Sequence, residues 1–108
     1  HPDTNGILAL GAPQCTNIIT AIRQKGTLAK YKIANFDVSP DTLQSLSKGE
    51  ILFSFDSQQY LMGYLPIVML TLNAKYGTLP TKNVYTGPTA VTAADVEKIS
   101  VLSKKGIR

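Results

Sequence analysis

The sequence predicts an α/β fold in which a parallel sheet is built from strands that alternate with helices. Short, continuously apolar runs, typical of strands buried on both faces, alternate with stretches of helical periodicity. Helix start and stop residues stand between these elements, and the resulting β-α-β order implies right-handed parallel crossovers. The chain has 108 residues, which matches one compact domain.

Apolar runs at four places in the chain predict the strands. They lie at residues 7–10, 31–36, 51–55 and 84–86. A turn at Gly87-Pro88 follows the last run, and Ala90-Val91 can extend the chain again as an additional short strand.

Capping residues and apolar spacing predict four helices. The first has apolar residues at positions 15, 18, 19 and 22, with Pro13 in its first turn and Gly26 as its stop. The second begins with Ser39 as the N-cap, carries Pro40 and Asp41 in its first turn, and ends at Gly49. Its inward residues are Leu43 and Leu46.

A longer helix is predicted from about Gln59 to Tyr76, where Gly77 stops it. Pro66 inside this helix should loosen or kink one turn, because proline lacks the N–H that the preceding turn needs. The last helix starts after Thr92 as cap, with Asp95 at its third position.

Composition excludes several classes of protein. Apolar residues make up 44% and charged residues 17%, which argues against disorder. The net charge of +4 is mild and its cations are scattered, so no nucleic-acid-binding stripe is expected. No apolar run reaches the roughly 20 residues that span a bilayer. The chain starts without Met, which is compatible with processing or with a fragment.

Cys15 is the single cysteine, so it has no internal disulfide partner. It is either a nucleophile or a small buried side chain, and we favour burial because His1, the sole histidine, lies at the extreme N-terminus. No metal-ligand spacing, phosphate loop or nucleophile elbow is present. We therefore expect no cofactor, no metal and no catalytic residues.

Small polar residues follow three of the predicted strands, at 11–14, 35–39 and 56–59. The carboxyl ends of parallel strands meet at one edge of a sheet, where ligands of open α/β folds bind. The side chains there are carboxylates, amides and hydroxyls. This set suits a neutral, polyhydroxylated ligand.

Asp37 and Asp56 end neighbouring strands and have three possible roles. They can accept hydrogen bonds from ligand hydroxyls, or form an acid/base pair as in glycosidases. Asp37 can alternatively cap or turn the chain before the helix that begins near Ser39. Tyr60 and Tyr64 can stack on a sugar ring, but their helical spacing favours core packing, most clearly for Tyr64.

Four motifs in order resemble the C-terminal part of type I periplasmic sugar-binding proteins of bacterial ABC importers, of the ribose- and galactose-binding kind. The family typically has a Gly-Phe-Asp strand end, a helix closed by Gly before a strand, a Gln-Gln-Pro-Tyr-like hinge before a Gly-containing helix, and a Thr-Gly-Pro turn. The corresponding segments here are residues 31–43, 48–51, 55–64 and 86–88.

The resemblance implies ligand-binding roles for four residues. Asp37 matches the family aspartate that binds sugar hydroxyls, and Asn35 replaces the common Gly two residues before it. Asp56 and Ser57 fall at the hinge position of the family's ligand-binding Gln. Gln14 lies in the loop where many members carry an Asn-Asp pair, and the absence of that pair here implies a different polyol or sugar.

The resemblance also implies an incomplete, Rossmann-like lobe of a two-lobed protein. Residues of about 1–56 and 87–108 would form part of the second lobe, and about 58–86 would cross to the first lobe. A C-terminal fragment is therefore expected, with the missing N-terminal half of the same protein as a partner. The apolar face of the long helix would otherwise be exposed, or covered by self-association of the fragment.

The function that the resemblance implies is non-enzymatic: a sugar or sugar alcohol is bound between two lobes and handed to an ABC permease in the membrane. The location would be the periplasm, or the outer surface of a Gram-positive cell through a lipid anchor. One alternative is the effector-binding core of a LacI-type repressor, which has the same fold. Another is a small α/β hydrolase or transferase that uses Asp37 and Asp56.

Overall fold

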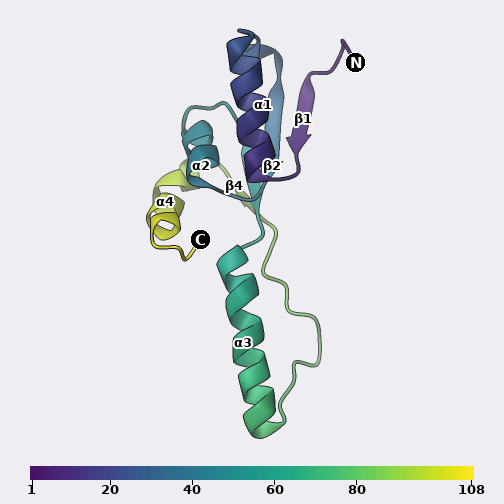
Figure 1. Ribbon diagram of the computed structural model, residues 1–108, viewed down its shortest axis with the longest axis vertical. Helices are drawn as coiled ribbons and strands as arrows, with labels where there is room; N and C mark the ends of the chain where they lie inside the picture. The colour runs from purple at the N-terminus through teal and green to yellow at the C-terminus, as the bar shows by residue number, and fades with distance from the viewer.

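The computed structural model describes residues 1–108, and its elements follow the predicted alternation of strands and helices (Figure 1). The strands are β1 (Gly6–Ala9), β2 (Lys32–Phe36), β3 (Phe53–Asp56) and β4 (Thr89–Val91). The helices are α1 (Ala12–Gln24), α2 (Pro40–Ser47), α3 (Gln59–Tyr76) and α4 (Val96–Lys104). Two short 3-10 turns lie at Leu28–Lys30 and Ala93–Asp95.

The four strands form one sheet in the order β1-β2-β3-β4. The first three are parallel, as predicted, with Ile33 beside Ile7 and Ala34 beside Phe53. β4 runs antiparallel to β3, and Val91 lies opposite Ser54. The sheet is therefore mostly, and not wholly, parallel.

The predicted strand at 84–86 is wrong, and the optional extension around Ala90 is the real fourth strand. Val84 and Tyr85 are exposed, at 51% and 81%. Thr86 is engaged through its hydroxyl, which donates to the carbonyl oxygen of Ser57 at 2.9 Å. Sheet pairing begins only after the Gly87-Pro88 turn. Residues 84–86 have strand-like side chains, but no strand lies beside them.

Side-chain hydrogen bonds at the N-terminal caps define where α2 and the turn before α4 begin. Ser39 caps α2 as predicted: its hydroxyl accepts from the Thr42 N–H at 3.2 Å, and Thr42 Oγ1 accepts from the Ser39 N–H at 2.7 Å. Before α4, the backbone N–H and the hydroxyl of Thr92 both donate to Asp95, which lowers the pKa of the Asp95 carboxyl. α3 is continuous through Pro66 and ends at Gly77, which has the left-handed conformation (φ 67°).

One hydrophobic core lies between the sheet and the helices α1, α2 and α4. Ile19 comes from α1, Ile33 from β2, Leu46 from α2 and Ile99 from α4, and each is at most 3% exposed. Leu43 and Leu46 point inward, as predicted. In this article the sheet with these three helices is called the body.

α3 and the chain that returns from it, residues 59–88, extend away from the body as an arm (Figure 1). No residue of α3 is buried. The arm makes the molecule long: its extents are 59 × 31 × 20 Å, and its radius of gyration is 17.3 Å where a compact chain of this length has about 13 Å. None of the helices combines the length and the apolarity that crossing a bilayer requires.

Candidate functional site

A cavity of about 540 Å³ lies at the carboxyl ends of β1 and β2. Residues from the strand ends and from the first two turns of three helices line it, among them Gly11, Thr16, Asn17, Asp37, Asp41 and Gln59. The N-termini of α1, α2 and α3 follow the ends of the three parallel strands, so their partial positive charges lie at this edge of the sheet. The predicted convergence of polar side chains at one edge is therefore present.

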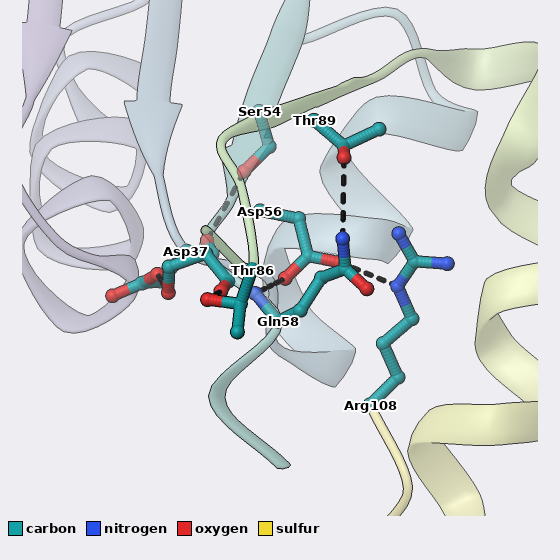
Figure 2. A network of polar contacts seen from close by, with 8 residues as sticks. Asp37, Ser54, Asp56, Gln58, Thr86, Thr89 and Arg108 are labelled. Atoms are coloured by element: carbon teal, nitrogen blue, oxygen red, sulfur yellow. Dashed lines mark hydrogen bonds and ion pairs between the residues drawn. The ribbon is translucent and has the colours of Figure 1, made fainter. Parts of the chain in front are cut away.

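Asp37 lies at the cavity in a left-handed backbone conformation, with φ 65°. Its N–H donates to the Phe55 carbonyl at 2.6 Å. Its carbonyl accepts from Asn35 Nδ2 at 2.8 Å and from Ser54 Oγ at 3.1 Å. Its carboxylate atom Oδ1 accepts from Ser57 Oγ at 2.6 Å. Two strands and the crossover after β3 thus hold one acidic residue beside the cavity (Figure 2).

Asp56 lies in a different environment, although it also ends a strand. It is 2% exposed and does not line the cavity. Its Oδ1 accepts from the Gln58 N–H at 2.8 Å, and its Oδ2 accepts from Arg108 Nε at 2.5 Å. Figure 2 shows the Asp56 side chain directed at Arg108. Asp37 therefore lines the cavity, whereas Asp56 is bonded to Arg108 outside its lining.

The remaining candidates lie near the cavity without lining it. Gln14 is exposed, and its side chain folds back over Gly11, so that a Cβ at Gly11 would come within 2.5 Å of Gln14 Oε1. Ser57 is half-buried and directs its hydroxyl to Asp37. Among the four predicted site residues, the cavity lining includes Asp37.

Sequence reasoning did not name Asn17 or Asp41 as cavity residues, and it placed Gln59 only within the polar segment 56–59. All three lie in the first two turns of helices that follow the parallel strands. The signal that identifies them is the same convergence rule that identifies Asp37, extended from the strand end into the next helical turn.

The two segments that connect the body to the arm lie side by side. Thr86 Oγ1 donates to the Ser57 carbonyl at 2.9 Å, and Asp56 pairs with Thr89 in the sheet. A Cβ at Gly87 would lie 2.7 Å from the Asp56 carbonyl oxygen, so the absence of a side chain permits this approach. Figure 2 shows both segments converging on this network of polar contacts.

Cys15 is fully buried, which confirms the structural role predicted for it. Burial without a compensating charge raises the pKa of its thiol to about 11, so it stays protonated at neutral pH. No three His, Cys, Asp or Glu side chains gather as a metal site would require.

Tyr60 and Tyr64 stack on one another with ring centroids 5.9 Å apart, and they are 49% and 53% exposed. The body therefore does not supply the core packing that their helical spacing favours. Neither residue lines the cavity.

The chain is similar to known sugar-binding proteins over nearly its whole length. It is 27% identical to the xylose/arabinose-binding protein of Sulfolobus acidocaldarius, over 96% of this chain and 27% of that protein. A carbohydrate transporter from Acidothermus cellulolyticus, solved with myo-inositol, is 28% identical with a TM-score of 0.88, over 99% of this chain and 37% of that one. A carbohydrate transporter solute-binding protein from Agrobacterium radiobacter, solved with D-arabinose, is 27% identical with a TM-score of 0.76, over 100% and 36%.

A LacI transcriptional regulator from Bacteroides fragilis also has this fold. Its TM-score is 0.77 over 91% of this chain and 33% of that one, but the identity is 16%, so this likeness concerns the fold alone. No protein-family model matches the chain. The relatives described above are named as binding and transport proteins, and the chain spans between about a quarter and two fifths of their length.

The mostly parallel sheet, the paired crossovers and these sequence similarities agree with one another. The resemblance predicted from the sequence is thereby confirmed: in sequence and in fold, the chain is similar to a part of the sugar-binding proteins of ABC importers.

Proposed function

We propose that this chain forms part of the substrate-binding component of an ABC importer for a sugar or sugar alcohol, which binds its ligand without chemical change. The observation that carries this proposal is the Asp37 carboxylate, held beside a polar cavity at the carboxyl ends of parallel strands. A carboxylate accepts hydrogen bonds from neutral hydroxyls, and each such bond contributes roughly 1.5–3 kcal/mol. The LacI-type alternative is supported by the fold alone.

The ligand class follows from the groups around the cavity. Asp37 and Asp41 are acceptors, while the amides of Asn17 and Gln59 can both donate and accept. No Lys or Arg lines the cavity, so a phosphorylated or carboxylated ligand would find no counter-charge there. Neutral polyhydroxylated rings such as xylose, arabinose and inositol, which the relatives' descriptions name, fit this set of groups.

The cavity would be one wall of a cleft between two lobes. Residues of about 1–56 and 87–108 would belong to the second lobe, and about 58–86 would cross to the first. The extension of the arm away from the body supports this assignment (Figure 1). The rest of the protein would cover the apolar surface of α3, and closure about the paired crossovers would enclose the sugar.

The remaining partners and the location follow from this role. The loaded protein would deliver its ligand to an ABC permease, and it would act in the periplasm or, with a lipid anchor, on the outer surface of a Gram-positive cell. When α3 is not covered by a first lobe, we expect self-association of the chain through it. Such a dimer would show in the solution mass of residues 1–108.

Calorimetric titration of the intact protein with D-xylose, D-arabinose and myo-inositol tests the proposal. We expect saturable binding of at least one of them, and we expect Asp37→Ala to weaken it by at least about tenfold. Asp3→Ala is the matched control, because Asp3 is exposed and precedes β1, at the opposite end of the sheet. Unchanged affinity of Asp37→Ala would remove Asp37 from the site, and the absence of binding to any of the three would count against the function.

A further inference from the structure

The backbone of Asp37 has little freedom to move, because three neighbours hold its peptide groups. Phe55 accepts from its N–H at 2.6 Å, and Asn35 and Ser54 donate to its carbonyl at 2.8 and 3.1 Å. These bonds come from β2, which precedes the turn, and from β3, which lies beside β2 in the sheet. They fix the left-handed conformation of Asp37, which is unfavourable for a residue with a side chain.

The Asn35 side chain holds the Asp37 turn at a cost in stability. Its side chain is completely buried, and its amide nitrogen donates to the carbonyls of both Phe36 and Asp37. Its own Oδ1 is buried without any hydrogen-bond partner. A buried polar atom without a partner is costly and needs an explanation. The explanation here is that the orientation in which Asn35 Nδ2 donates to the Asp37 turn leaves Oδ1 without a donor.

The side chain of Asp37 is held by one residue, Ser57. Ser57 Oγ donates to Asp37 Oδ1 at 2.6 Å, and no other side chain donates to this carboxylate. A serine hydroxyl has a single proton to donate, and Ser57 gives it to Asp37. Ser57 itself does not line the cavity. The carboxylate therefore keeps Oδ2 available while Oδ1 is anchored.

We propose that Ser57 is a positioning residue, which orients the Asp37 carboxylate for a ligand hydroxyl without touching the ligand. This inference rests on the proposed function and replaces the direct ligand contact expected for Ser57 from the sequence. A carboxylate already fixed in one rotamer loses less conformational entropy on binding. Ser57 also accepts a hydrogen bond from Thr86 through its carbonyl, so the orientation of Asp37 is tied to both crossovers.

A double-mutant cycle in the intact protein tests this role, with D-xylose, D-arabinose and myo-inositol as the titrated probes. We expect Ser57→Ala to weaken binding about tenfold, and Ser57→Thr, which keeps the hydroxyl, to stay within about threefold of the wild type. In an Asp37→Ala background, Ser57→Ala should have no further effect. Ser47→Ala is the matched control, because the Ser47 hydroxyl bonds only within α2.

Each outcome supports or overturns the inference. A loss in Ser57→Ala that persists in the Asp37→Ala background would mean that Ser57 contacts the ligand itself, and the inference would be wrong. Unchanged affinity in Ser57→Ala, or no rescue by Ser57→Thr, would overturn it as well. These results leave the proposed function intact, whereas a wild-type protein that binds none of the three probes overturns the function and this inference together.

Discussion

The body and the arm of this chain contain similar apolar residues but keep them in opposite surroundings. All 15 buried residues lie outside residues 57–90, in the sheet or in the segments packed on it. In the arm, Ile67, Leu70 and Tyr76 are 65%, 64% and 71% exposed. The body is held by a core of its own, whereas α3 is held within this chain by its backbone hydrogen bonds and by few side-chain contacts.

The comparison shows that a local sequence pattern can predict a helix without predicting whether that helix is buried. α3 forms over the predicted residues because its apolar residues favour helix and Gly77 stops it. A helix in a folded protein gains most of its stability by packing an apolar face, and the body provides no such packing for α3. The exposed apolar surface is the physical argument for a cover supplied by another lobe or by a second copy.

The largest expected effect comes from equivalent leucine truncations in the two regions. Leu46 is fully buried in the core, so Leu46→Ala should lower the unfolding free energy by about 2–5 kcal/mol. Leu70→Ala in α3 should change it by less than about 0.5 kcal/mol in residues 1–108. Urea unfolding measures both. In the intact protein the cost of Leu70→Ala should rise, and equal costs in both proteins would contradict a covering first lobe.

The second comparison concerns two ion pairs of different burial. The Asp56–Arg108 pair ties the C-terminal residues to the base of the arm, with side chains 3% and 21% exposed. Arg108→Gln should cost about 1.5–3 kcal/mol, because a buried carboxylate loses its charged donor. Arg23→Gln is the matched control, since Arg23 is 52% exposed and its bond to Glu50 contributes about 0.2–1 kcal/mol.

The contribution of the Arg23–Glu50 pair to the unfolding free energy should also depend on pH. Burial acts to raise the pKa of Glu50, but hydrogen bonds from Arg23 and Ser45 outweigh it and lower the pKa below 4.5. A carboxyl with a lowered pKa stabilises the fold above its ordinary pKa and loses that contribution as the pH falls. The stability difference between wild type and Arg23→Gln should therefore shrink in acid, and a constant difference from pH 7 to pH 3 would contradict the assignment.

The last comparison concerns two glycines of the arm, one at its base and one inside α3. Gly87→Ala should destabilise the protein by about 1–3 kcal/mol, because its Cβ would lie 2.7 Å from the Asp56 carbonyl oxygen. Gly63→Ala in α3 meets nothing within 4 Å and should stabilise the helix by about 0.5–1 kcal/mol. Thermal melting separates the two signs, and a neutral Gly87→Ala would mean that the crossovers can move apart.

Helices were predicted well because their signals are local. Ser39 and Thr42 form a reciprocal cap three residues apart, and Gly77 ends α3 at the predicted place. The fourth strand was predicted only as an optional extension at Ala90-Val91, because a three-residue strand exists only through its partner. Thr89 pairs with Asp56 across more than thirty residues, while Val84 and Tyr85 have strand-like side chains but no strand beside them.

The sequence by itself determined the alternation of strands and helices, the edge of the sheet where polar residues meet, and Asp37 as the main candidate for binding. Only the tertiary structure placed Asp37 at the cavity and Asp56 against Arg108. Both are aspartates at strand ends, yet Arg108, which is 52 residues from Asp56, neutralises and buries that carboxylate. Ser57 instead leaves Asp37 at the cavity with one oxygen anchored. Local patterns carry no information about which distant side chain reaches a carboxylate, so the role of each aspartate depends on the folded chain.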